Sequence, residues 1–327
     1  MRALPKVELH LHLEGAAPPG FIRSLAAEKH VDISGIFDAN GAYAFNGFAD
    51  FLRVYEAASS VLRSPEDYAR LTAAVLEDLA GQSVIYAETF VCPALCGAGD
   101  LPAWRDHLAA MTEVSARVAA AGGPVLRGIA TAIRHFGPER ARAAALCAAE
   151  TAGDWLVGFG MAGNETLGKA GDFAWAFDCA REAGLRLTCH AGEWAGPEAI
   201  RETIGALGVE RIGHGLSAVR DPALVEMLAE RGIVLEICPG SNIALGLCAG
   251  WAAHPIAKLR DAGVKVTIST DDPPFFRTTL TREYERLAEA FGWEEADFAA
   301  LNRVAAEAAF CDAGTRDDIL QQTGASR

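Results

Sequence analysis

Two histidines separated by a single residue are the first feature of the chain that could do chemistry. His10 and His12 stand in the run VELHLHL. On a β-strand, whose side chains alternate with a period of two, both imidazoles point to the same side and can chelate a metal ion. Two hydrogen-bonded structural histidines would give the same pattern, so this pair alone does not establish a metal site.

Further metal-ligand types follow other apolar runs of the sequence. His190 stands in TCHAGE, His214 in RIGHG, and Asp271 with Asp272 in STDDP. Histidine nitrogens with a carboxylate suit Zn²⁺, which can keep one position for a water whose pKa falls toward about 7. Adjacent carboxylates raise one pKa unless a cation neutralises one of them, so Asp271 is predicted to bind the metal and Asp272 a substrate. His214 is either a further ligand or a partner that orients the hydroxide.

A carboxylate beside this cluster could move protons. Glu193 lies three residues after His190, where it could reach a substrate and act as general acid or base. The alternative is a first-turn glutamate of the next helix, which would favourably meet the helix dipole. The other four histidines are interpreted as surface or capping residues: His30, His107, His135 and His254.

Short apolar runs alternate with stretches of helical spacing, which is the pattern of βα units. The expected strands are Val7–Leu13, Ser83–Phe90, Val125–Ile133, Trp155–Ala162, Leu185–His190, Arg211–His214, Ile233–Cys238 and Val264–Ser269. The expected helices between or beyond them include Trp104–Ala120, Glu139–Ala149, Asp172–Ala183, Ala195–Leu207, Asp221–Glu230, His254–Asp261, Leu280–Phe291 and Ala296–Phe310. Such a series predicts a (β/α)₈ TIM barrel, with a doubly wound sheet as the alternative.

A helical insertion and a helical tail account for the length beyond a barrel of about 250 residues. Residues 15–78 follow the first strand, contain expected helices at Phe48–Leu62 and Pro65–Leu79, and are predicted to cover the C-terminal mouth of the barrel as a lid. The segment after Asp272 also has a helical pattern. No linker or low-complexity tract interrupts the chain, so residues 1–327 are predicted to form a single domain.

The composition argues against several classes of partner. Hydrophobic residues make up 51% of the chain, and 29 Lys and Arg against 43 Asp and Glu give a formal net charge of −14. This charge disfavours nucleic-acid phosphates and anionic membrane surfaces. No apolar stretch suits a membrane span or signal peptide, so a cytoplasmic protein is expected. The eight cysteines form no CxxC pair and are expected to be reduced, with Cys189 as the minor candidate for a nucleophile. Nothing in the sequence indicates an oligomeric state.

Six motifs together carry a family resemblance. PKVELHLHLEGA, GMAGNE, TCHAGE, RIGHG, EICPGSN and STDDP occur in this order over residues 5–273. They closely resemble the adenosine deaminase family of the amidohydrolase superfamily, a (β/α)₈ group with one zinc ion, and the combination is highly specific. The resemblance implies hydrolytic deamination of a small-molecule purine at C6, with release of ammonia.

The resemblance also implies residue roles. Glu193 would donate a proton to the purine N1, and His214 would orient the attacking hydroxide. The single Zn²⁺ would be held by His10, His12, His190 and Asp271.

Other residues are assigned to the substrate. Asp272 would contact N7, the backbone of Gly163 would contact N3, and His12 would also face the substrate. An apolar wall that excludes water is expected from the insertion, with Phe48, Phe51 and Leu52 as candidates. Ordinary helix packing is the alternative role for each of these three.

Three departures from the family pattern concern the substrate. Adenosine-specific members usually read HLDG, with an Asp on a ribose hydroxyl, whereas this chain has Glu14, as relatives acting on adenine or other 6-aminopurines often do. The chain reads GNE at residues 163–165, where adenosine deaminases usually read GDE. In CPGSN it has Gly240, where the family often has a larger residue, and this glycine is expected to open room for the substrate.

We predict that the substrate is a 6-aminopurine nucleoside, most directly adenosine, because GMAGNE and CPGSN are similar to the nucleoside deaminases. Adenine or another 6-aminopurine derivative is the alternative. A catalytically inactive nucleoside-binding protein is a remote alternative, because such a protein is expected to have lost a metal ligand or the proton donor.

Overall fold

A closed ring of parallel strands forms the centre of the molecule. The computed structural model describes residues 1–324 and places eight strands in the order β1 to β8, each paired in parallel with the next. The bounds are β1 (Lys6–His12), β2 (Val84–Val91), β3 (Val125–Ile133), β4 (Leu156–Ala162), β5 (Arg186–Ala191), β6 (Arg211–His214), β7 (Val234–Ile237) and β8 (Lys265–Ile268). The ring closes beyond β8, where the His12 N–H donates to Asp271 O and the Asp271 N–H to His10 O, each at 3.0 Å. The predicted (β/α)₈ barrel is confirmed, and the doubly wound alternative is wrong.

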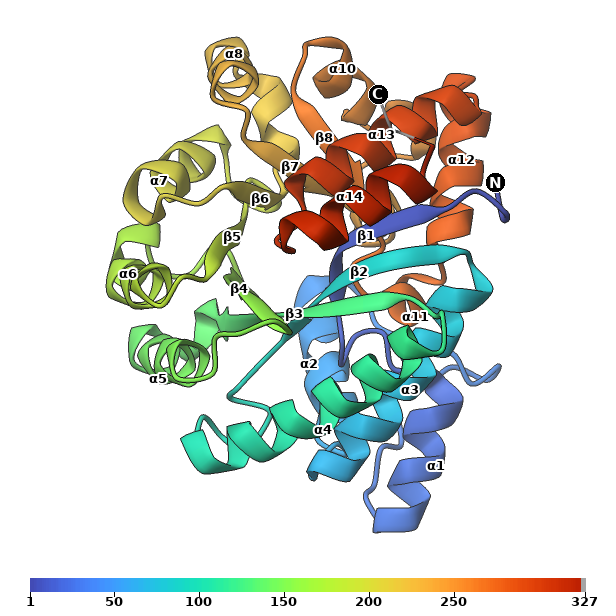
Figure 1. The fold of residues 1–327 in the computed structure, drawn as a ribbon, viewed down its shortest axis with the longest axis vertical. Helices are drawn as coiled ribbons and strands as arrows, with labels where there is room; N and C mark the ends of the chain where they lie inside the picture. Colours follow the sequence, from blue (N-terminus) through green and yellow to red (C-terminus); the bar gives the residue numbers. More distant parts are fainter. Residues whose placement is uncertain (325–327) are drawn as a thin grey trace.

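Helices surround the strands on the outside (Figure 1). Both faces of each strand are therefore covered, which explains why the strands read as continuous apolar runs. The helices between strands are α4 (Leu101–Ala120), α5 (Pro138–Ala149), α6 (Ala174–Glu182), α7 (Pro197–Leu207), α8 (Pro222–Arg231), α9 (Pro239–Ala244) and α10 (Ile256–Asp261). Most begin with Pro in the first turn, and Asp100 and Asp221 cap α4 and α8 by accepting from backbone N–H groups.

The insertion after β1 contains three helices, α1 (Pro19–Lys29), α2 (Phe48–Ser59) and α3 (Pro65–Gly81). Ser64 and Asp67 form a reciprocal capping box that starts α3, with Pro65 at its first position. The expected helices at 48–62 and 65–79 match α2 and α3 within a few residues. Phe51 and Val54 of α2 join the buried core, so the insertion packs onto the barrel rather than standing apart from it.

The tail also consists of helices: α11 (Pro273–Phe276), α12 (Leu280–Phe291), α13 (Glu295–Ala308) and α14 (Ala313–Gln322). Helix α13 packs against β1 and β8 (Figure 1). Helix α14 was not predicted from the sequence. Ile319 is its one buried residue, so its sequence carries no apolar stripe that would indicate a helix. None of the described helices is long and apolar enough to cross a membrane.

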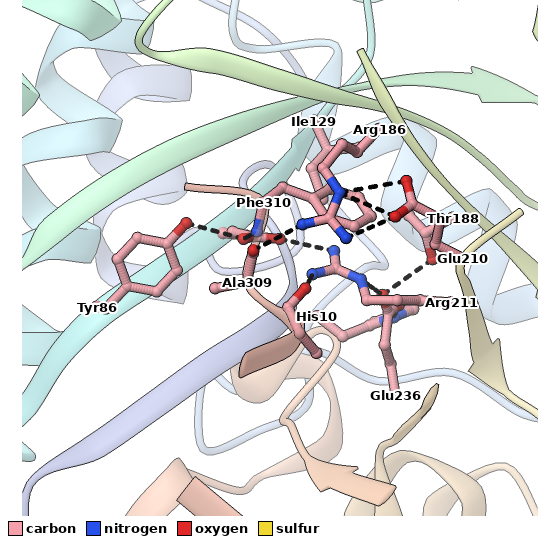
Figure 2. Close-up of polar contacts among 12 residues, drawn as sticks. His10, Tyr86, Ile129, Arg186, Thr188, Glu210, Arg211, Glu236, Ala309 and Phe310 are labelled. Carbon is pink, nitrogen blue, oxygen red and sulfur yellow. Dashed lines mark hydrogen bonds and ion pairs between the residues drawn. The ribbon is translucent and has the colours of Figure 1, made fainter. Parts of the chain in front are cut away.

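A charged network fills the N-terminal end of the barrel (Figure 2). Arg211, at the start of β6, contacts Glu88 of β2 at 2.6 Å and Glu236 of β7 at 2.5 Å, and all three side chains are buried. The Arg211 guanidinium carbon lies 3.5 Å from the centroid of the Phe310 ring, and that of Arg186 lies 4.6 Å from it. The segment after α13, which contains Phe310, therefore packs against this end of the barrel.

Candidate active site

Barrel closure places Asp271 beside both histidines of β1. The distance from Asp271 Oδ1 to His12 Nε2 is 3.2 Å, and to His10 Nε2 it is 3.6 Å. Ser241 Oγ donates to the other carboxylate oxygen of Asp271 at 2.7 Å. Asp271 has φ of 67° and His214 has φ of 62°, so both residues hold a backbone conformation that is costly for side chains other than Gly.

The remaining histidines of the cluster approach from β5 and β6. One ring nitrogen each of His10, His190 and His214 lie within 4.8 Å of one another, and all three residues are buried. The Nε2 atoms of these histidines have no hydrogen-bond partner. The buried, unpartnered nitrogens of His10 and His190, next to the Asp271 carboxylate, are donors that Zn²⁺ prefers, so they fit a zinc ion, and His214 is the third ring beside them.

The charges of the cluster favour a cation. Burial opposes the charged form of His10, but the neighbouring carboxylates of Asp271 and Glu236, the latter hydrogen-bonded to Nδ1, raise its pKa to about 9. Burial lowers the pKa of His190 well below its usual range, so this ring stays neutral and can offer a lone pair. Burial and the neighbouring Asp271 raise the pKa of Asp272 well above its usual range. The two adjacent aspartates are thus driven to opposite protonation states.

A buried loop after β5 carries Glu193. Its Oε2 lies 3.7 Å from His214 Nε2. Burial and the Asp271 charge raise the pKa of Glu193 well above its usual range. Glu165 holds the loop by accepting from four backbone N–H groups, including those of Glu193 at 3.0 Å and Trp194 at 2.9 Å. Glu165 stands in GMAGNE, but sequence reasoning gave it no role, because the bonds it makes are to backbone groups.

A cavity opens directly over this cluster. It is lined by the site residues His12, Gly163, His190, Glu193, His214, Asp271 and Asp272 and by Phe48, Phe51, Leu52, Tyr55, Glu56, Leu95, Ile133, His135, Phe136, Ala162 and Leu245. The three candidates for an apolar wall therefore lie on the cavity, together with Gly163. The Phe48 ring also packs on Trp194 at a centroid distance of 4.5 Å.

Gly163 is required at the edge of this cavity. Its φ is +94°, and a Cβ would stand 2.7 Å from His135 Nδ1. The Asn164 N–H donates to that same nitrogen at 3.2 Å, and His135 Nε2 lies 3.4 Å from Glu56 on helix α2.

The four histidines assigned to surface or capping positions divide into two groups. His30 does cap α1, in the left-handed conformation. His254 is only 2% exposed, but it also makes a capping contact, because its Nδ1 accepts from the Ile256 N–H at the start of α10. The interpretation is wrong for His107, which is 4% exposed and lies beside the Tyr68 ring, and His135 lies on the cavity.

Glu14 is buried beside the hydroxyl groups of two tyrosines. It is not among the described residues that line the cavity. Tyr68 OH donates to Glu14 Oε1 at 3.1 Å, and Tyr55 OH lies 3.5 Å from Oε2. Burial raises the pKa of Glu14 to about 7.

The expectation for Gly240 is wrong. A Cβ at this position would stand 2.2 Å from Glu283 Oε1, and the Gly240 N–H donates to the Glu283 carboxylate at 2.9 Å. The glycine therefore makes room for a buried glutamate and not for a substrate. One of the two motifs that favoured a nucleoside loses its physical basis.

The cysteines offer no activated nucleophile at this site. Burial raises the pKa of the Cys189 thiol to about 12. The same effect raises the pKa of the Cys238 thiol, near His10 and Asp271, well above its usual range. Both side chains therefore remain neutral thiols at ordinary pH.

Comparisons with known proteins agree with this geometry. The family model described as adenosine deaminase matches residues 5–325. The adenine deaminase of Rhizobium leguminosarum bv. trifolii is 49% identical over 317 residues, which cover 97% of this chain and 98% of that protein. The structure of adenine deaminase from Arthrobacter aurescens superimposes with a TM-score of 0.91 at 26% identity, covering 98% of both chains. A zinc-bound amidohydrolase from Burkholderia ambifaria has a TM-score of 0.83 at 26% identity, covering 99% of this chain and 94% of the other. The chain belongs to the adenosine deaminase family.

Proposed function

We propose that this purine deaminase converts adenine and water to hypoxanthine and ammonia, using one bound Zn²⁺. The observation that carries the proposal is the arrangement of Glu193 and His214 over a buried cluster of histidine nitrogens and the Asp271 carboxylate. Such an arrangement combines a metal-binding donor set with a proton donor and a cavity of apolar walls.

Two observations support the free base over the nucleoside. The relative that is 49% identical across nearly the whole of both chains is named adenine deaminase. In addition, the Glu14 carboxyl is buried, engaged by Tyr68, and has its pKa raised to about 7 by burial. A carboxyl held in this way is a poor acceptor for a ribose hydroxyl. Adenosine is the second candidate, favoured by Gly163 of GMAGNE, which lies on the cavity.

We assign the metal to His10, His12, His190 and Asp271, whose nitrogens and carboxylate gather at the barrel mouth. When bound, a zinc ion lowers the pKa of a water ligand and supplies hydroxide at neutral pH. Ser241 and Glu236 orient two of these side chains through hydrogen bonds to Asp271 and His10, each at 2.7 Å.

The remaining polar groups act on the purine. Glu193, kept protonated by burial and by the neighbouring Asp271, donates its proton to N1 as C6 is attacked. Asp272 is neutral for a similar reason and donates a hydrogen bond to N7. Phe48, Phe51 and Leu52 exclude bulk water from the cavity.

The test is direct conversion of adenine. Zinc-loaded protein is incubated with adenine, and hypoxanthine and ammonia are measured together with zinc content. We expect equal amounts of the two products, about one zinc per chain, and loss of turnover when the metal is stripped. Zinc-loaded protein that binds adenine without releasing ammonia would instead identify a binding protein and disprove the proposal.

A further inference from the structure

A chain of hydrogen bonds behind the site begins at a backbone N–H, which can only act as the donor. The Ile256 N–H donates to His254 Nδ1 at 3.2 Å. A ring nitrogen that accepts a hydrogen bond carries no proton, so neutral His254 must carry its proton on Nε2. His254 is 2% exposed, which keeps water from replacing this bond.

The proton on His254 sets the orientation of the next side chain. His254 Nε2 lies 3.2 Å from Asn242 Oδ1 and donates to it. The amide nitrogen of Asn242 must then face the other way, where it lies 3.2 Å from His214 Nδ1. Turning the amide over would place its NH₂ group against the His254 N–H, and both residues are too buried for water to intervene.

The Asn242 amide therefore donates to His214 Nδ1, and the His214 proton resides on Nε2. This Nε2 has no hydrogen-bond partner and lies 3.7 Å from Glu193 and 3.9 Å from Asp271. A protonated ring nitrogen cannot ligate a metal, but it can donate a hydrogen bond. The sequence alone did not distinguish whether His214 is a metal ligand or a hydrogen-bond partner of the hydroxide.

We propose that Asn242 and His254 are positioning residues that fix His214 as an Nε2–H donor to the oxygen attacking the purine, and thereby keep it from ligating the metal. The inference rests on the proposed function for the identity of that oxygen, but the tautomer of His214 follows from the hydrogen bonds alone. It also gives a role to His254, a buried histidine on no catalytic motif.

The tautomer can be measured without a turnover assay. Nitrogen-15 NMR of the zinc-loaded protein, labelled at histidine, distinguishes protonated from unprotonated ring nitrogens. Signals of His214 are identified by their loss in His214→Gln. We expect His214 with Nε2 protonated and Nδ1 unprotonated. The opposite tautomer, or a metal-bound Nε2, would overturn the proposal in the wild-type protein itself.

Variants then separate positioning from general packing. In Asn242→Asp the carboxylate can only accept, so Nδ1 takes up a proton and the neutral tautomer with its single proton on Nε2 is lost. We expect kcat to fall by roughly 10²–10³, the usual effect of removing one such donor, with KM and zinc content unchanged. Wild-type kcat in a folded N242D protein would contradict the proposal.

Two substitutions at His254 compare loss of its hydrogen bonds with their retention. His254→Phe keeps a ring but removes the donor, which frees the Asn242 amide to turn, and kcat should fall. His254→Gln can accept from Ile256 and donate to Asn242, so it should restore much of the activity lost in H254F. Equal kcat in the two folded variants would show that His254 only fills space. A correct tautomer in a protein without deaminase activity would instead count against the proposed function alone.

Discussion

Glu193 is the residue whose replacement separates proton donation from metal binding. Its carboxyl is buried, and its pKa is raised well above the usual range by burial and by Asp271. We expect Glu193→Gln to keep its zinc and lose roughly 10²–10⁴ in kcat, because an amide cannot donate a proton to N1. Glu198→Gln, an exposed first-turn residue of α7, is the control and should keep wild-type kcat. Full activity in E193Q would show that Glu193 is not the proton donor.

His12 tests the ligand set at the same scale. Its Nε2 lies 3.2 Å from Asp271, and its removal takes away one of the proposed ligands. His12→Ala should lose zinc and with it the thermal stabilisation that added zinc gives the wild-type protein. His107→Ala removes an equally buried histidine away from the site and should keep its zinc. Stoichiometric zinc in H12A would refute the assignment.

At the scale of elements, the sequence predicted most strands and helices because βα periodicity and capping are local signals. The candidates for metal binding and proton transfer at His12, His190, Glu193, His214 and Asp271 line one cavity, since parallel strands end at one mouth, whereas Glu14 does not line it. What the sequence missed depends on partners far along the chain. The bonds of Glu165 to the loop of Glu193, and the contact of Asn242 with His214, join segments that no spacing rule connects. Gly240 was misread because its neighbour is Glu283.

The N-terminal end of the barrel provides a prediction about stability. Arg211 is buried between Glu88 and Glu236, so Arg211→Met leaves two carboxylates without their cation. Breaking such a pair costs about 3–5 kcal/mol, which urea unfolding can measure. Arg186→Met, which also removes a contact with the Phe310 ring, takes away a half-exposed arginine that pairs with Glu210 and not with Glu88 or Glu236, and should cost less. Equal losses of unfolding free energy in the two variants would mean that packing on Phe310, and not the ion pairs of Arg211, accounts for the destabilisation.

For the molecule as a whole, buried carboxyls make stability depend on pH. Burial raises the pKa of Glu283 to about 8 from an ordinary value of 4.5. Between these values the native state keeps a proton that the unfolded chain releases, so the free energy of unfolding falls as the pH rises. Glu283→Gln should remove this part of the decline, and its stability relative to wild type should increase from pH 5 to pH 8. Glu285→Gln, exposed on the same helix, is the control. Parallel pH profiles for E283Q and wild type would contradict the assignment.

The preference of the whole enzyme between base and nucleoside tests the central claim most directly. Steady-state kcat/KM is measured for adenine and for adenosine with the same zinc-loaded protein at neutral pH. The buried, tyrosine-held Glu14 and the 49% identical adenine deaminase predict a higher kcat/KM for adenine. A higher kcat/KM for adenosine would contradict the account.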